Sequence, residues 1–368
     1  MTSKHEKTHE PLLRIASREA MPFWKAWLVR LIAVALSLVV CAGLIYALTK
    51  LNPIKVFEAM ISGAFGTEKR IWNTLKDTSF LLLIGIALAP AFKMRFWNIG
   101  AEGQVLIGGV ATAACMIYFG DKLPVYILFP LMVISSCIAG ALWGALPAVF
   151  KSKWNTNETL FTLMMNYVAI QVTSYCVAMW ENPFGSNSVG IINPKTQAGW
   201  FPALFGQKYG WNILIAVVIC VLVFVYLKYT KHGYEISVVG ESENTARYAG
   251  INVGKVFIRT MLVSGAICGL AGFVAVSGAS HTISVNTAGG NGFTAIIVAW
   301  LAKFNPLIMA VIALLLTLLD KGAVQIASQF GLNDYVSKMI TGIILFFILG
   351  SEFFINYKLI LRSKKEGK

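Results

Sequence analysis

The segment Phe96–Gly109, FWNIGAEGQVLIGG, joins two strongly apolar runs at 78–92 and 99–118, yet it carries a carboxylate, two amides and several glycines. An ionised side chain inside a bilayer costs at least a few kcal/mol unless it is paired or hydrated, so Glu102 indicates a functional site in the membrane. The same residue also suits the first turn of a helix that begins near the membrane surface. The residues alone leave both interpretations open.

The surrounding composition decides the class of protein. Of the 368 residues, 57% are hydrophobic and only 13% are charged, whereas soluble domains average about 25% charged residues. Such a chain has too few charges to cover its own surface in water, and several runs approach the roughly 20 apolar residues that cross a bilayer. The sequence therefore predicts an all-α, polytopic membrane protein.

Ten apolar runs predict about ten transmembrane helices. They lie near 27–48, 78–92, 99–118, 124–149, 158–180, 211–228, 256–278, 293–302, 306–320 and 336–353. The run at 293–302 is too short to cross a bilayer alone, so we expect a half-helix or a re-entrant element there. Ten spans place both termini on the same side of the membrane.

The basic residues indicate which side that is. Lys and Arg concentrate in cytoplasmic loops, and cytoplasmic termini place roughly two thirds of the 31 basic residues inside. No basic stripe is interleaved with stacking aromatic residues, so the net charge of +14 does not indicate nucleic-acid binding. The predicted organisation is a polar cytoplasmic tail (1–26), one transmembrane domain (27–357), external loops (49–77 and 181–210), a cytoplasmic loop (229–255) and a basic cytoplasmic tail (358–368).

Motifs for catalysis and for nucleotide binding are missing from the sequence. No G-x-x-x-x-G-K-[ST] segment is present to cradle a nucleotide, and neither HExxH nor GxSxG occurs. The six cysteines fall within apolar runs and show neither CxxC nor a metal-ligand spacing. We therefore expect no catalytic residue, metal or cofactor in this chain.

Three further segments combine glycines or amides with apolar runs. SGAICGLAG, from Ser264, sets Gly265, Gly269 and Gly272 at helical spacing, which lets transmembrane helices pack backbone to backbone. In NTAGGNGFTAIIVAW, at 286–300, glycines and amides precede a short apolar run, which is typical of a broken helix. In KWNTNETLFTLMMNYVA, Asn166 lies deeper in a span than the other amides and is expected to face protein or a pathway.

The centre of the 229–255 loop, GESENTARYAGI, predicts a short amphipathic helix at 240–251. Acidic and capping residues precede it, and Gly250 is placed to end it. Ala246, Ala249 and Gly250 would form a low-relief face that another protein approaches closely. An ordinary helix between two spans remains the alternative.

Taken in order, these segments resemble the permease subunits of ABC importers that carry branched-chain amino acids, simple sugars or nucleosides. The resemblance covers roughly residues 50 to 360, and NIGAEGQ with NE…MMNY is most similar to the nucleoside-type members. It implies a type II-like importer fold in which two permeases form the pathway, as a heterodimer or a homodimer. It also implies ATPase subunits that use ATP and Mg on the cytoplasmic side, and an external substrate-binding lipoprotein at a bacterial plasma membrane.

The resemblance also implies roles for particular residues. The loop that docks on the ATPase corresponds to Gly240, Glu241, Asn244, Ala246, Ala249, Gly250 and Ile251. Residues expected in the pathway or its support are Asn98, Glu102, Gln104 and Asn166. The sequence departs from the family after its glycines, where Ile297, Trp300 and Ala302 interrupt the usual small-residue run.

The sequence therefore predicts a nucleoside permease subunit, with a simple-sugar or branched-chain amino acid permease as the alternative within the family. A lipid-modifying membrane enzyme would need a clustered nucleophile, base or metal set, which the sequence does not offer. An ion-coupled secondary transporter is the alternative of another class. It would need a relay of ionisable residues, for which only Glu102 and Glu158 are candidates.

Overall fold

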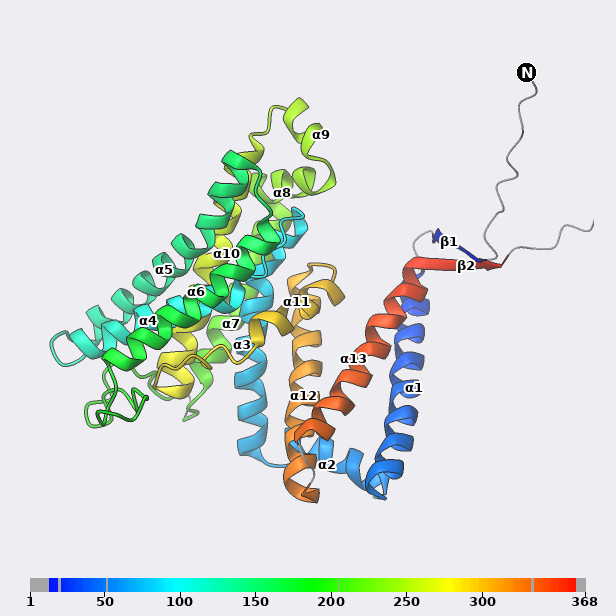
Figure 1. The fold of residues 1–368 in the computed structure, drawn as a ribbon, viewed down its shortest axis with the longest axis horizontal. Helices are drawn as coiled ribbons and strands as arrows, with labels where there is room; N and C mark the ends of the chain where they lie inside the picture. The colour runs from blue at the N-terminus through cyan, green and yellow to red at the C-terminus, as the bar shows by residue number, and fades with distance from the viewer. Residues whose placement is uncertain (1–12, 19–20, 51, 205, 332–333, 362–368) are drawn as a thin grey trace, which may run out of the picture. The chain divides into compact units, whose positions relative to one another are not determined.

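The computed structural model describes residues 13–18, 21–50, 52–204, 206–331 and 334–361. The elements in order are β1 (Leu13–Ser17), α1 (Phe23–Thr49), α2 (Pro53–Phe65), α3 (Glu68–Lys93), α4 (Ala101–Phe119), α5 (Val125–Trp154), α6 (Glu158–Met179), α7 (Gly210–Tyr229), α8 (Lys231–Glu241), α9 (Glu243–Tyr248), α10 (Val253–Ala275), the π-helical turn η1 (Val276–Ser280), α11 (Asn291–Leu301), α12 (Pro306–Phe330), α13 (Asp334–Asn356) and β2 (Tyr357–Leu361) (Figure 1).

Within these described ranges, nine helices are long and apolar enough to cross a membrane, and α11 is a shorter apolar helix of 11 residues. The prediction of an all-α, multi-pass membrane protein is confirmed, including the short tenth element. Several spans, among them α3, α5 and α12, are longer than the apolar runs alone indicated. Helix α3 begins ten residues before the run at 78–92, so part of the segment predicted as an external loop is helical. Helix α2 occupies another part of that segment.

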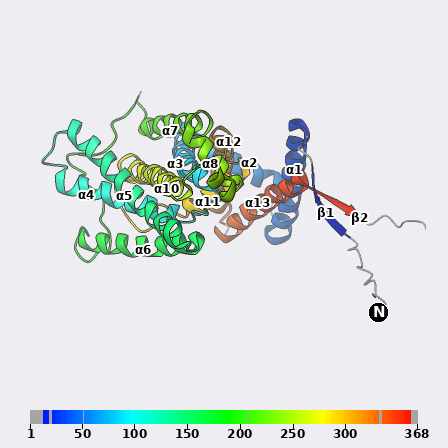
Figure 2. The same cartoon turned by 90° about the horizontal axis from the view of Figure 1, so that it is seen from above.

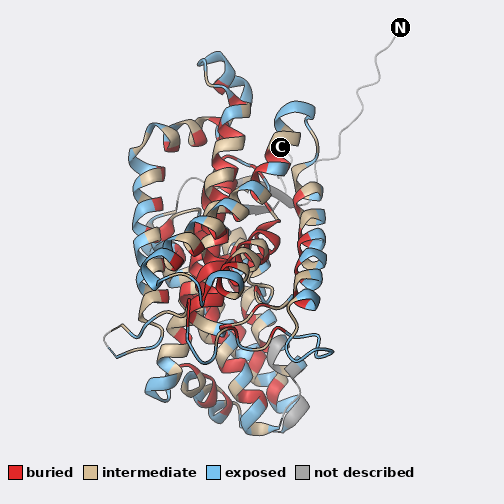
Figure 3. Cartoon of the chain, turned by 90° about the vertical axis from the view of Figure 1, so that its left-hand side faces the viewer, coloured by how far each residue is buried: buried red, intermediate tan, exposed pale blue. Residues whose placement is uncertain are grey.

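The chain divides into two compact units, one of Met1–Gly63 with Leu319–Lys368 and one of Ala64–Leu318. In the unit of Ala64–Leu318, α3 and α10 form the interior: 78% of the residues in the apolar stretch of α3 and 72% of those in the span Val253–Ser280 are buried. Figure 3 shows buried residues gathered on the central helices. Helix α10 packs against α3, α4 and α5, while α6 lies along α4 (Figures 1 and 2).

Glycines set the close packing of α10. A Cβ atom at Gly265 would meet the carbonyl oxygen of Gly140 in α5, and one at Gly269 would meet the carbonyl oxygen of Ser136. On the side that faces α4, a Cβ at Gly272 would meet the carbonyl oxygen of Val105. Helices α4, α5 and α10 thus approach one another backbone to backbone, which small residues permit.

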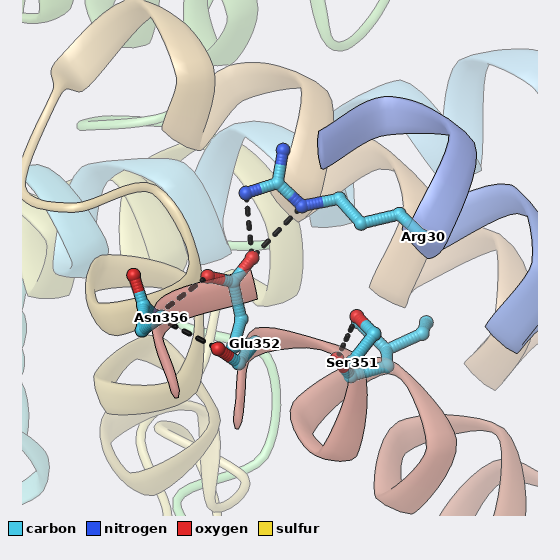
Figure 4. Close-up of polar contacts among 5 residues, drawn as sticks. Arg30, Ser351, Glu352 and Asn356 are labelled. Atoms are coloured by element: carbon cyan, nitrogen blue, oxygen red, sulfur yellow. Dashed lines mark hydrogen bonds and ion pairs between the residues drawn. The ribbon is translucent and has the colours of Figure 1, made fainter. Parts of the chain in front are cut away.

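The other unit pairs the first and last long helices. Helix α1 packs on α13, and the thiol of Cys41 lies 3.8 Å from the carbonyl oxygen of Ile340. Figure 4 shows an ion pair across these two helices, in which the guanidinium of Arg30 donates to Glu352 Oε1 at 2.5–2.8 Å. Asn356 donates to the backbone oxygen of Glu352 at 2.8 Å and so supports the same carboxylate residue. An arginine in a spanning helix is therefore paired inside the protein.

The predicted tails contain an element that the sequence did not indicate. Strand β1 lies within the segment 1–26 that was predicted to be a polar tail, and it pairs antiparallel with β2, from Leu13 opposite Leu361 to Ser17 opposite Tyr357. Residues 1–12 and 362–368 of the predicted tails lie outside the described residues. The short strands have no strong alternating pattern over enough residues to be recognised from sequence.

Candidate functional site

The segment between α3 and α4 is tied together by two buried amides. Asn98 Oδ1 accepts from the backbone N–H of Gly100 at 3.0 Å and from Gln104 Nε2 at 3.2 Å. Asn98 Nδ2 donates to Gln104 Oε1 at 3.4 Å and to Ser264 Oγ of α10 at 3.5 Å. Because the two amides satisfy each other in the interior, their role in this structure is to hold the start of α4 against α10.

Helix α6 holds the same start from another side. Asn166 Oδ1 accepts from Gly103 N–H and its Nδ2 donates to the carbonyl oxygen of Ile99, both at 2.8 Å. Thr162 Oγ1 also accepts from Ile99 N–H at 3.1 Å. Gly100, which precedes α4, has no side chain to cap the helix, so α6 supplies a partner to one of the N–H groups that every helix start leaves open.

Glu102 joins α4 to the short helix α11. Its Oε1 accepts from the backbone N–H of Gly290 and its Oε2 from that of Gly292, each at 2.7 Å. Gly290 occupies the N-cap position of α11 with φ +77° and has no side chain of its own to cap the helix. A carboxylate is the group that a helix N-terminus attracts most. Glu102 therefore caps the N-terminus of α11, although its own position is in the first turn of α4.

The chain around this cap crosses the unit as a broken helix. Helix α10 ends in η1, residues 281–290 form no helix, and α11 then runs for 11 residues. At 1.5 Å per residue α11 extends about 16 Å, roughly half of a bilayer's hydrocarbon core. Irregular backbone next to such a half-helix is stable in a membrane protein only when it is buried in protein or lines a cavity. The predicted half-helix is thus present, with its N-terminus held by Glu102.

Aromatic rings surround the other end of α11. Trp300 stacks on Trp97 with ring centroids 5.2 Å apart and lies edge-on to Phe304 at 5.6 Å. Phe92 of α3 contacts both Trp97 and Phe304. The departure from the family pattern at Trp300 therefore adds a contact between α11 and the FWNIGAEGQ segment.

One helix was expected over 240–251, but this segment contains the end of α8, which closes at Glu241, and the separate short helix α9. Ser242 adopts extended backbone angles between α8 and α9, and its side chain caps α9 by accepting from Thr245 N–H at 3.2 Å. As predicted, Gly250 follows the last turn, with φ +76°. Serine, like Thr, Asp and Asn, is preferred at the N-cap of a helix, which explains the break at Ser242.

The residues named for ATPase docking separate into two groups. Ala246 is fully buried, and Gly240 is buried where a Cβ atom would meet the carbonyl oxygen of Lys93 in α3. The low-relief face therefore lacks Ala246, which turns inward and holds α9 in place. Facing solvent are Glu241, Asn244, Ala249 and Gly250, with Ile251 half-buried. Tyr248, which sequence reasoning passed over, is 94% exposed beside them.

An ion pair anchors α8 to α10. Arg259 donates to Glu235 Oε2 at 2.7 Å, and this hydrogen bond lowers the pKa of the Glu235 carboxyl below its usual value. A carboxylate with a lowered pKa favours the folded arrangement at neutral pH. Helix α8, which directly precedes the exposed α9, is thus anchored to the interior helix α10.

The two residues named for an ion relay have separate partners. Glu158 pairs with Lys151 at 3.1 Å, whereas Glu102 binds backbone amides of α11. Among the described residues, no group of three or more His, Cys, Asp or Glu side chains is placed to hold a metal ion. Glu102 and Glu158 therefore share no hydrogen-bond or ion-pair partner in the part of the chain that the structure describes.

One buried histidine was missed by the sequence analysis. The ring of His281 stacks on Trp200 with centroids 3.9 Å apart and planes 9° apart, and His281 is only 7% exposed. Its backbone oxygen accepts from Ile192 N–H at 2.8 Å. A lone histidine gave no signal in the sequence. Its position shows that part of the 181–209 segment is fastened to the end of η1.

Comparison with known proteins agrees with this architecture. The profile of the family described as branched-chain amino acid transport system / permease component matches residues 70–349. The guanosine ABC transporter permease protein NupP of Bacillus subtilis is 30% identical over 327 residues, which cover 88% of this chain and 93% of that protein.

Two other relatives match over most of their length. The nucleoside ABC transporter permease protein NupB of Lactococcus lactis is 28% identical over 81% of this chain and 84% of its own. The glucose ABC transporter permease protein TsgB13 of Haloferax volcanii is 27% identical over 96% of this chain and 95% of its own. The family profile covers well over half of the chain. This chain therefore belongs to the branched-chain amino acid transport system permease family.

Proposed function

We propose that this chain is the permease subunit of an ATP-driven importer for nucleosides, purine nucleosides or related ones. The observation that carries the proposal is the extended similarity to permeases named for guanosine and for nucleosides, at 30% and 28% identity. The NIGAEGQ segment, which resembles the nucleoside-type members, supports the same substrate class. The chain works in a bacterial plasma membrane with both termini in the cytoplasm.

Energy comes from partner subunits. ATPase subunits that bind ATP and Mg dock at the α8–α9 end, a second permease completes the pathway, and an external binding lipoprotein delivers the solute. Asn244, Tyr248, Ala249 and Gly250 are exposed on and just after α9, and this supports an ATPase contact there. Ala246 anchors α9 by its burial, and Arg259 anchors the preceding helix α8. Closure of the ATPases would move α8 and α9 and, through α10 and α3, the helices around α11.

The proposal is tested by uptake of radiolabelled guanosine in cells that lack the gene and in cells with the gene restored. We expect uptake to return with the gene, to be blocked by unlabelled adenosine, and to persist when the proton gradient is collapsed while ATP is maintained. Uptake that stops on loss of the proton gradient with ATP unchanged would instead identify an ion-coupled secondary transporter.

Sugar transport is the second candidate, and the glucose permease relative that matches 96% of this chain favours it. Glucose and branched-chain amino acids are therefore used as competitors in the same assay. A hundredfold excess of glucose or of leucine should leave guanosine uptake unchanged. Glucose uptake that depends on the gene, with no guanosine uptake, would replace the nucleoside assignment by the sugar assignment.

The ATPase contact is tested with one substitution at two exposed alanines. Ala249→Arg places a large cation in the exposed turn after α9, whereas Ala203→Arg makes the same change in the 181–209 segment. We expect Ala249→Arg to abolish co-purification of the ATPase and Ala203→Arg to leave it intact, with both proteins present in the membrane at wild-type amounts. Equal amounts of ATPase co-purified with the two variants would show that the ATPase does not dock at α9.

A further inference from the structure

A cavity of about 330 Å³ lies inside the unit of Ala64–Leu318, next to the broken segment between η1 and α11. Its walls come from α3, α7, the end of α10, η1, the residues that follow η1 and the start of α11. The lining includes Asp77, Phe80, Asn212, Ser284, Asn286 and Thr287. The volume is at the lower end of the range of small-molecule sites.

The cavity carries no net charge. Its two ionisable lining residues are Lys76 and Asp77, which pair at 3.0 Å. The ammonium group of Lys76 also lies over the ring of Tyr209, 5.3 Å from its centroid. A zwitterion or an anion in the cavity would need counter-charges that are already engaged, and a buried charge without a partner is costly. The charge pattern therefore favours an uncharged solute.

The half-helix beside the cavity does not call for an anion either. A helix N-terminus attracts negative charge through its open N–H groups and its dipole. At α11 the N–H groups of Gly290 and Gly292 already donate to the Glu102 carboxylate. With that positive end neutralised, a phosphate or carboxylate on the solute would gain little from it.

The walls offer both hydrogen-bond donors and acceptors. Asn212 is buried and donates to the carbonyl oxygen of Val274 at 3.4 Å, but its Oδ1 has no partner among the described residues. Ser284 and Thr287 place their hydroxyl groups 3.5 Å apart, and Asn286 is exposed beside them. Buried polar atoms are nearly always satisfied in native proteins, so the open acceptor of Asn212 indicates a water or a ligand donor.

An aromatic ring completes the set. Phe80, partly exposed, lines the cavity together with the aliphatic side chains of Val274 and Ala275. Flat heterocycles such as nucleic-acid bases stack favourably on such rings. The amides and hydroxyls of the walls suit a hydroxylated solute, and the ring of Phe80 adds a flat apolar surface. The combination fits a solute with a flat base and a hydroxylated part.

We propose that this cavity is a solute-binding site and that its ligand is an uncharged nucleoside. This assignment rests on the proposed function and adds to it a binding site lined by residues of one permease chain. The base stacks on Phe80, and the hydroxyl groups of the ribose bind among Asn212, Ser284 and Thr287.

Solute protection of an introduced thiol tests the site directly. Thr287→Cys is labelled with a membrane-impermeant methanethiosulfonate reagent in the complete transporter in its membrane, with wild-type labelling of the six native cysteines as background. Guanosine should slow the labelling at least fivefold, whereas glucose should not. The matched control Ala203→Cys, in an exposed segment that does not line the cavity, should be labelled at the same rate with and without guanosine.

Binding measurements separate the roles of the ring and of the amide. Isothermal titration of guanosine into the purified permease should show a Kd raised at least tenfold by Phe80→Leu and by Asn212→Ala. Phe119→Leu removes an exposed ring at the end of α4 and should leave the Kd unchanged. Retained thermal unfolding of each variant establishes that it is folded.

The outcomes distinguish this inference from the proposed function. If cells import guanosine through this protein but guanosine neither protects Thr287→Cys nor loses affinity in Phe80→Leu, the cavity is not the site and the nucleoside importer stands. Protection by glucose and not by guanosine would overturn the ligand assignment. Absence of both uptake and binding would overturn the nucleoside function itself.

Discussion

The carboxylate of Glu102 accepts a 2.7 Å hydrogen bond from the backbone N–H of Gly292, a residue 190 positions later in the chain. A Cβ atom at position 292 would lie 2.5 Å from the backbone nitrogen of Glu102, so the two helix starts approach closely only because residue 292 is glycine. One acidic side chain therefore neutralises the positive end of α11 and fixes where that half-helix begins.

Replacement of this carboxylate should destabilise the protein. In Glu102→Gln, one acceptor oxygen becomes an NH2 group that faces a backbone N–H, and a buried donor without an acceptor costs about 1–3 kcal/mol. We expect a lower Tm in detergent and a lower rate of guanosine uptake. The control Glu241→Gln changes an exposed carboxylate and should keep the wild-type Tm. Equal Tm values for the two variants would show that Glu102 does not hold α11.

The packing of α10 on α5 makes a second prediction. Gly269→Ala places a Cβ atom against the carbonyl oxygen of Ser136, which cannot move without shifting α5. We expect lower thermal stability and less folded protein in the membrane, because transmembrane helices that meet at glycines lose their close contact. Gly43→Ala, with nothing within 4 Å of the new Cβ, should be neutral or slightly stabilising. Wild-type behaviour of Gly269→Ala would contradict the observed helix spacing.

The paired amides of Asn98 and Gln104 should be coupled energetically. Each single alanine variant leaves the other amide without its partner, so the double variant should be less destabilised than the sum of the singles. Contacting residues show coupling of about 0.5–3 kcal/mol in double-mutant cycles. The cycle is measured by unfolding in mixed detergent. In a control cycle that combines Asn98→Ala with Asn244→Ala, in exposed α9, the losses of stability should be additive. Additive losses in both cycles would show that Asn98 and Gln104 do not stabilise each other.

The buried ring of His281 should make stability depend on pH. Burial, with a contribution from the charge of Lys208, lowers the pKa of His281 to about 4, whereas the unfolded chain titrates near 6.5. The folded state thus binds fewer protons between these values. The stabilising contribution is complete above pH 6.5 and is lost as the pH falls from 6.5 towards 4.

This pH dependence is measured as the change in Tm between pH 7.5 and pH 5. His281→Phe keeps a ring against Trp200 but cannot titrate, so its Tm should change less over that interval than the wild-type Tm. His232→Gln, in α8, should keep the wild-type change. Glu235, whose pKa is lowered, loses its stabilising effect only below the usual carboxyl range and does not contribute in this window.

The sequence was sufficient for features that depend on composition and period. The apolar runs predicted the spanning helices and the short α11, and Gly250 ends α9 as its position indicated. What it did not supply were partners far apart in the chain. Nothing near Glu102 points to Gly290, and nothing near Asn166 points to Ile99, because packing of α4 against α6 and α11 creates these pairs. The inward direction of Ala246 likewise follows from how α9 packs, since alanine alone does not reveal which face it occupies.

The pairing of Arg30 with Glu352 has a consequence for biogenesis. Helix α1 enters the membrane early in synthesis, but its carboxylate partner is made more than 300 residues later, in α13. Until α13 is inserted, the guanidinium of Arg30 has no Glu352 in the membrane, and an unpaired cation there is unfavourable. A ribosome stalled before α13 would leave the guanidinium of Arg30 without its carboxylate partner. Completion of translation is therefore what secures the first helix.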